Sequence, residues 1–183
     1  MVWRVAATRA AGVALVLFCL CCVSLRPGQA VSPEVERGQY LVAVISCTDC
    51  HTPGTFFGHP DMSRFLGGSD VGFAIPGLGV FVGPNLTPDP ATGLGKWTEA
   101  EIVTALTTGV RPDGRILASI MPWRSFAHLT PSDALAIAAY LKSLKPVQHK
   151  VPGPFGPKET ATVPVMAVIP GAVYAGLPAP GAK

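Results

Sequence analysis

Two cysteines and a histidine lie together in the segment Cys47-Thr48-Asp49-Cys50-His51, which has the form Cys-x-x-Cys-His. This pattern is typical of covalent haem attachment. Two thiols at this spacing reach the two vinyl groups on one side of a porphyrin, and the same short turn places the next histidine under the iron. We therefore expect Cys47 and Cys50 to bind haem c and His51 to be an iron ligand.

Two other uses of the cysteine pair remain as alternatives. A thioredoxin-like redox pair lies between a strand and a helix of a sheet protein, and the sequence predicts no such strand. A zinc site needs two further ligands at suitable spacing; His59 could supply one, but the chain has no second Cys-x-x-Cys. The histidine that directly follows Cys50 favours haem over both.

The sixth position of the iron needs another ligand or stays open, because the porphyrin fills four positions and His51 the fifth. Met121 is preferred because it lies in the segment Ser119 to Trp123, where Pro122 stiffens a short loop and the aromatic side chain can cover the haem. Taken alone, a methionine is usually core filling. The other candidates are Met62, Met166, His59, His128 and His149.

A first helix is predicted over residues 33–46, leading into the cysteine motif. Ser32 suits its N-cap, Pro33 suits its first position, and acidic residues follow in the first turn. Residues 52–96 contain ten glycines and no sustained helical periodicity. They are predicted to form a long irregular loop region, which is unusual unless it wraps something such as a prosthetic group.

Two more helices are predicted after this loop region. Thr98 and Glu101 form a capping box, and the helix that they start is expected to end at Gly109. A third helix covers residues 130–144, where apolar residues recur at helical spacing until a Lys-Pro pair ends it.

Residues 1–30 have the layout of a secretory signal peptide. Two basic residues precede a charge-free apolar run, residues 10–25, and the small residues Gly28 and Ala30 follow where a signal peptidase reads. We expect cleavage after Ala30 and export to the periplasm. The alternative is an uncleaved anchor on the periplasmic face of the membrane, since residues 2–7 would extend the run to spanning length.

The predicted domain covers residues 31–147, and residues 148–183 form a tail rich in proline, glycine and alanine. The tail predicts neither a regular helix nor a strand. Its apolar content favours packing against something, either its own domain or a docking partner.

Charge gives no sign of a nucleic-acid partner. The formal net charge of the whole chain is +3. Without residues 1–30 the chain loses three arginines, and its basic and acidic residues are then equal in number. No block of like charge remains, so DNA or RNA binding is not predicted.

Three stretches occur in a fixed order: RGQYLVAVISCTDCHT, then GPNLTPDPATGLGKWTEAEIVTALTTGVRPDGRIL, then IMPWRSFAHLTPSDALAIAAYLKSLKPV. Together they cover about residues 36–147 and resemble the class I cytochrome c family. The resemblance is closer still to the cytochrome c domains of bacterial membrane-bound alcohol and gluconate dehydrogenases. It implies an all-α fold of about three to five helices, with long loops, around one covalently bound haem c.

The resemblance also implies roles for individual residues. It supports Met121 as the sixth ligand and gives the carbonyl of Pro84 the task of orienting His51, with Pro53 as a rival. The first and last helices would cross, with Gly38 and Tyr40 meeting Tyr140 and Leu141. The residues implied near the haem propionates are Trp97, Arg111 and Arg115, the alternative being solvated surface arginines.

The expected function is electron transfer by a single haem, and not catalysis. Such a protein would accept electrons from a dehydrogenase and pass them towards a terminal oxidase of a respiratory chain. The chain carries one attachment motif where the dehydrogenase subunits carry three, and no long C-terminal anchor. A stand-alone carrier or a small haem subunit of a dehydrogenase complex is therefore expected. A ligand-binding sensor or peroxidase is the alternative if Met121 does not bind iron.

Overall fold

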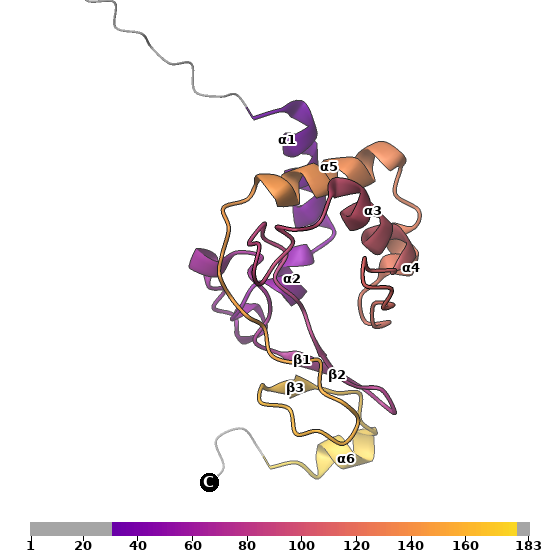
Figure 1. The fold of residues 1–183 in the computed structure, drawn as a ribbon. Helices are drawn as coiled ribbons and strands as arrows, with labels where there is room; N and C mark the ends of the chain where they lie inside the picture. The colour runs from indigo at the N-terminus through magenta and orange to yellow at the C-terminus, as the bar shows by residue number, and fades with distance from the viewer. Residues whose placement is uncertain (1–30, 179–183) are drawn as a thin grey trace, which may run out of the picture. The chain divides into compact units, whose positions relative to one another are not determined.

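The computed structural model describes residues 31–178, shown in Figure 1. The predicted signal peptide or anchor, residues 1–30, lies outside the described residues, as do residues 179–183 of the tail. Among the described residues no helix is both long enough and apolar enough to cross a membrane.

The first helix, α1, covers Pro33–Val44 and is capped as predicted, because the Ser32 side chain accepts a hydrogen bond from the Val35 N–H at 3.3 Å. It ends two residues before the predicted boundary. Ser46 adopts the left-handed conformation, with φ of 58°, and this turn starts a separate short helix, α2, at Cys47–His51. The cysteine motif therefore occupies a helix of its own, angled away from α1.

Helix α3 covers Glu99–Thr108, and its predicted capping box is present. The Thr98 N–H donates to Glu101 at 2.7 Å, and the Glu101 N–H donates to the Thr98 hydroxyl at 3.2 Å. Gly109 ends the helix with φ of 77°, a conformation that favours glycine. All three features confirm the prediction.

Helix α5 covers Pro131–Ser143 and begins, as predicted, at Thr130, whose hydroxyl accepts from the Asp133 N–H at 3.1 Å. A short helix, α4, covers Trp123–Phe126 and links the predicted ligand loop to α5. Figure 1 shows α3 beside α5, with α4 next to α3, as their contacts also indicate.

The crossing of α1 and α5 is the most extensive contact between elements in residues 31–178. Gly38 makes this crossing possible: a Cβ there would collide with the carbonyl oxygen of Ala136 and lie 2.7 Å from Cβ of Tyr140. Tyr40 does not share the crossing as the resemblance implied. It is 57% exposed and lies beside Arg37, because the helical turn directs Leu41 and Val42 inwards instead.

The core consists of apolar residues from α1, α3, α4 and α5, together with two loop leucines. Its buried members are Leu41, Val42, Leu66, Leu94, Ile102, Leu106, Phe126, Ala136, Ile137, Ala138, Tyr140 and Leu141. This core agrees with the predicted helical domain.

A small sheet makes the prediction of an all-α fold only partly correct. Strands β1, Gly72–Ile75, and β2, Gly79–Val82, form an antiparallel hairpin within the loop region that was predicted to be irregular. Gly77 supplies the tight turn with φ of 78°, and the β-branched and phenylalanine side chains of the two strands suit a pleated, half-buried surface. The short strand β3, Val165–Met166, pairs in parallel with β1.

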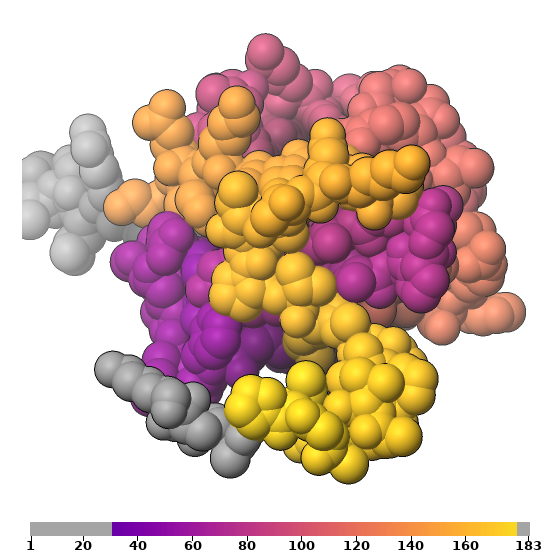
Figure 2. Space-filling model, turned by 90° about the horizontal axis from the view of Figure 1, so that it is seen from below, coloured from indigo at the N-terminus to yellow at the C-terminus, as the bar shows by residue number. Residues whose placement is uncertain are grey.

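The C-terminal segment also departs from the prediction, because it contributes β3 and a five-residue helix, α6, at Gly171–Ala175. Figure 2 shows this segment, orange to yellow, lying across the purple and magenta residues that follow the cysteine motif. Hydrogen bonds hold its first part, from Val147 to Phe155. Apolar side chains further along stay exposed: Val165, Met166, Val168, Val173, Tyr174 and Leu177.

Replacing Gly38 with alanine should destabilise the protein, because the new methyl group forces α1 and α5 apart. Overpacking of this kind costs about 1–3 kcal/mol, and more where backbone must move. Denaturant unfolding of the purified holoprotein would measure the loss. Gly171→Ala is the matched control, since a Cβ there meets nothing within 4 Å. Equal stability of the two variants would contradict the close approach at Gly38.

Candidate functional site

The cysteine motif forms all of α2, so its five residues share one turn of helix. Cys47 and Cys50 are free thiols, both partly buried, and the spacing of three residues places them on the same face of the helix. His51 follows at the end of the helix and is 5% exposed. The three side chains predicted to bind haem are therefore presented together.

The His51 side chain is hydrogen-bonded to a loop 33 residues further along the chain. Its ring nitrogen Nδ1 lies 2.7 Å from the carbonyl oxygen of Pro84. Gly83 permits this approach, because a Cβ there would collide with the carbonyl of Cys50 and lie 3.4 Å from Nδ1 of His51. Pro84 thus occupies the place that the resemblance gave it. The rival, Pro53, is fully buried, and its carbonyl accepts from the Asp61 N–H instead.

The contact with Pro84 fixes the chemistry of the imidazole. A carbonyl can only accept, so Nδ1 carries the proton and Nε2 keeps a free lone pair. Burial lowers the pKa of His51, and the bond to Pro84 opposes this in part. His51 therefore stays neutral near pH 7, the form in which histidine binds metals.

The environment of the two cysteines favours the protonated thiol over the thiolate. Burial raises the pKa of Cys47 to about 11 and also raises the pKa of Cys50. A redox pair acts through a thiolate of lowered pKa, so the raised values count against that alternative. In residues 31–178 no three histidine, cysteine or acidic side chains gather as a metal-ion site.

Met121 is half-buried and packs against the helical core. The other described methionines lie outside the core, because Met62 is 64% exposed and Met166 is 47% exposed. The remaining candidate ligands, His59 and His128, are exposed, while the ring of His149 bonds to the carbonyl of Gly67. Met121 is thus the candidate whose surroundings best suit a buried thioether ligand.

The structure brings Trp97, Arg111 and Arg115 into one cluster. The Arg111 guanidinium lies 5.2 Å from the Trp97 ring centroid, in cation–π geometry. Both arginines donate to Asp113, Arg111 at 3.4 Å and Arg115 at 3.0 Å. The side chain of Arg111 is 24% exposed and that of Arg115 is 56% exposed, so only Arg111 is substantially enclosed.

Trp123, the aromatic residue expected to cover the haem, also carries a donor that the sequence analysis did not consider. Its indole Nε1 is buried, and no acceptor within the described structure reaches it. The ring lies against Gly109, two residues before Arg111, and the Trp123 backbone N–H donates to the Met121 carbonyl at 2.8 Å. A buried unpaired donor beside Met121 suits a group with carboxylates, so the residues present fit a haem with its propionates.

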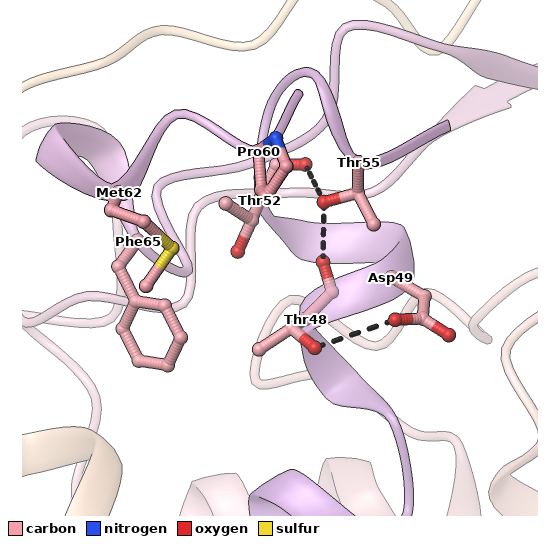
Figure 3. A pocket seen from close by; sticks show the side chains of 7 residues that line it. All are labelled: Thr48, Asp49, Thr52, Thr55, Pro60, Met62 and Phe65. Atoms are coloured by element: carbon pink, nitrogen blue, oxygen red, sulfur yellow. Dashed lines mark hydrogen bonds between the residues drawn. The ribbon is translucent and has the colours of Figure 1, made fainter. Parts of the chain in front are cut away.

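A pocket of about 310 Å³ borders α2 at Thr48 and Asp49 and is shown in Figure 3. Neither cysteine nor His51 lines it. Figure 3 shows Thr55 bonded to the carbonyls of Thr48 and Thr52, at 3.3 Å and 2.9 Å, which ties the motif helix to the following turn. The pocket is therefore lined by residues of α2 other than the three expected to bind haem.

Comparisons with known proteins agree with this geometry. The family model described as cytochrome c matches residues 35–145. The chain is 36% identical over 125 residues to an alcohol dehydrogenase (quinone) cytochrome c subunit of Gluconacetobacter polyoxogenes, covering 66% of this chain and 26% of that protein. It is 34% identical over 128 residues to a fructose dehydrogenase cytochrome subunit of Gluconobacter japonicus, covering 69% of this chain and 24% of that protein.

A third relative is a gluconate 2-dehydrogenase cytochrome c subunit of Pantoea cypripedii, 35% identical over 127 residues, which cover 69% of this chain and 27% of that protein. The chain thus spans about a quarter of the length of these relatives. The family match ends at residue 145 and leaves the C-terminal segment outside it.

Asp113 should remain ionised at unusually low pH. The Arg115 N–H, followed by the two guanidinium groups, holds its pKa at about 2. A depressed pKa means that the bonds to both arginines are complete above the ordinary pKa of aspartate and are lost as pH falls through about 2. The carboxyl carbon of Asp113, followed by NMR, should therefore show an ionised group at about pH 3. Titration with an ordinary midpoint near ~3.9 would contradict the cluster.

Proposed function

The chain belongs to the cytochrome c family, and we propose that it is an exported mono-haem c-type cytochrome that carries single electrons. The observation that carries this proposal is the buried His51, held by Pro84 at 2.7 Å beside two free thiols. Family membership implies that the haem c is bound covalently. The count of one rests on the single Cys-x-x-Cys-His motif of the sequence.

When bound, haem supplies an iron that alternates between the ferric and ferrous states, gaining or losing one electron. The chain's own residues would hold the haem and determine its reduction potential. Cys47 and Cys50 would hold the haem through thioether bonds, His51 would ligate the iron as a neutral imidazole, and Met121 is the proposed second protein ligand of the iron. A histidine and methionine pair raises the reduction potential and leaves no open position for substrate chemistry.

Neighbouring residues restrain the proposed iron ligands and the haem. Pro84 fixes the ring plane of His51, so the ligand does not reorient when the iron changes charge. Trp123, Arg111 and Arg115 are the proposed donors to the propionates, since indole and guanidinium N–H groups suit carboxylates. The core of α1, α3 and α5 excludes water from this side of the site.

The proposed place of action is the periplasm, on the basis of the signal-like sequence of residues 1–30. The relatives' names support a dehydrogenase as electron donor, because they are cytochrome subunits of alcohol, fructose and gluconate dehydrogenases. A terminal oxidase is the proposed final acceptor. In this role the protein transfers electrons and makes no bond to a substrate.

Met121→Ala should lower the reduction potential of the holoprotein and abolish the sulfur-to-iron charge-transfer band, because the thioether no longer stabilises the ferrous state. Potentiometric titration and the ferric absorption spectrum measure both effects. Met62→Ala is the matched control, since Met62 is 64% exposed. An unchanged spectrum in Met121→Ala would reject Met121 and favour a sensor or peroxidase with an open iron position.

A second candidate role is that of a small haem subunit within a dehydrogenase complex. The observation that favours it is the exposed apolar C-terminal segment, in which Val168 is 96% exposed and Tyr174 is 70% exposed. Exposed apolar patches of this kind commonly mark protein interfaces. No charged residue interrupts the sequence from Thr160 to Ala182, which suits an apolar partner surface.

Ending the chain after Thr160 tests this role, because it removes β3 and α6 and keeps the hydrogen bonds of residues 147–155. If the segment docks the cytochrome, the truncated protein no longer copurifies with its dehydrogenase but keeps its haem. Copurification that survives the truncation, measured against the full chain, would reject the docking role and favour a stand-alone carrier.

A further inference from the structure

Residues 147–151, here called the strap, follow the family-matched region and cross the two loops that flank His51. Figures 1 and 2 show the orange segment descending from α5 across the residues that follow α2. The strap is hydrogen-bonded to both loops that contact His51, at Asn85 in one and at Gly67 in the other. Each place is held by specific hydrogen bonds.

The first place is the loop that carries the Pro84 carbonyl. Asn85, the next residue, is 2% exposed, and its amide Nδ2 donates to the Val147 carbonyl at 2.7 Å. The Val147 N–H in turn donates to the hydroxyl of Thr87 at 3.0 Å. These bonds close the strap onto the residues just after Pro84. The Pro84 carbonyl orients the His51 ring. The residue that directly follows Pro84 is therefore hydrogen-bonded to the strap.

The second place is the backbone of His51 itself. The Gly68 N–H donates to the carbonyl of His51 at 2.8 Å, and Nδ1 of His149 lies 2.7 Å from the carbonyl of the preceding Gly67. Arg64 lies 3.4 Å from Nε2 of His149, so Nε2 accepts and Nδ1 is the donor. Val151 packs against Gly68 so closely that a Cβ there would collide with it.

The ring and the backbone of His51 are thus both connected to one short segment that lies outside the region matched by the family model. We propose that the strap is a positioning element for the iron's histidine ligand and that it tunes the reduction potential. The inference rests on the proposed function, in which His51 binds haem iron. A firm bond from Nδ1–H to a carbonyl makes histidine a stronger donor, which favours the ferric state. The strap therefore lowers the potential by keeping this bond firm.

His149→Ala tests the proposal in the holoprotein, because it removes the bond to Gly67 and leaves the haem-attachment residues intact. We expect the reduction potential to rise and the Nδ1–H proton of His51 to exchange with solvent about fivefold faster, because the bond that restrains the His51 backbone through Gly67 and Gly68 is lost. His149→Asn should restore both values, since its amide nitrogen can take the place of Nδ1 as donor. Potentiometry and NMR of the ferrous protein measure the two effects.

Two chain lengths separate the strap from the rest of the C-terminal segment. Ending the chain after Lys145 removes the strap and should reproduce or exceed the effect of His149→Ala. Ending it after Thr160 keeps the strap and should leave the potential unchanged. If the shorter chain does not fold, the comparison of His149→Ala with His149→Asn decides alone.

The proposal fails if His149→Ala lowers only the unfolding temperature and leaves both the potential and the Nδ1–H exchange rate unchanged, since the strap would then be purely structural. It also fails if the alanine and asparagine variants shift the potential equally. Failure of the proposed function is distinct, because the unmodified exported protein would then show no c-type haem absorption bands.

Discussion

The hydrogen bond between Nδ1 of His51 and the carbonyl of Pro84 joins groups that are 33 residues apart, and the chemistry of the site depends on it. A buried imidazole without a partner would be free to change tautomer or turn, and the nitrogen needed for metal binding would not be defined. The bond settles the tautomer, and burial keeps the ring neutral. The tight contact at Gly83 and the bonds that hold Asn85 all serve to keep the Pro84 carbonyl in place.

The parts of the structure that the sequence predicted are those specified by neighbouring residues. The caps at Ser32 and Thr130, the capping box of Thr98 and the stop at Gly109 each depend on contacts within a few positions, and all are present. Haem attachment could be predicted from the sequence for the same reason, because Cys47, Cys50 and His51 lie within one turn. The family match then extended these local signals to a fold.

The features that the sequence did not reveal depend on partners far along the chain. The hairpin of β1 and β2 lies within a glycine-rich stretch that carries no clear alternation, and β3 is only two residues long. The end of α1 was misplaced because Ser46 adopts a left-handed turn that its identity does not require. Asn85 bonds across 62 positions and His149 across 82, and nothing near either residue marks these contacts. The buried Nε1 of Trp123 could be recognised only once its surroundings were known.

The separation in sequence between the cysteine motif and the strap also bears on the order of events during biogenesis. The residues of the strap leave the ribosome about a hundred positions after Cys47. Until then the loops on either side of His51 lack their cross-connections, and the thiols lie in a less restrained part of the chain. The bonds of Val147 and His149 can form only after this delay, so the motif is synthesised well before the contacts that restrain its histidine.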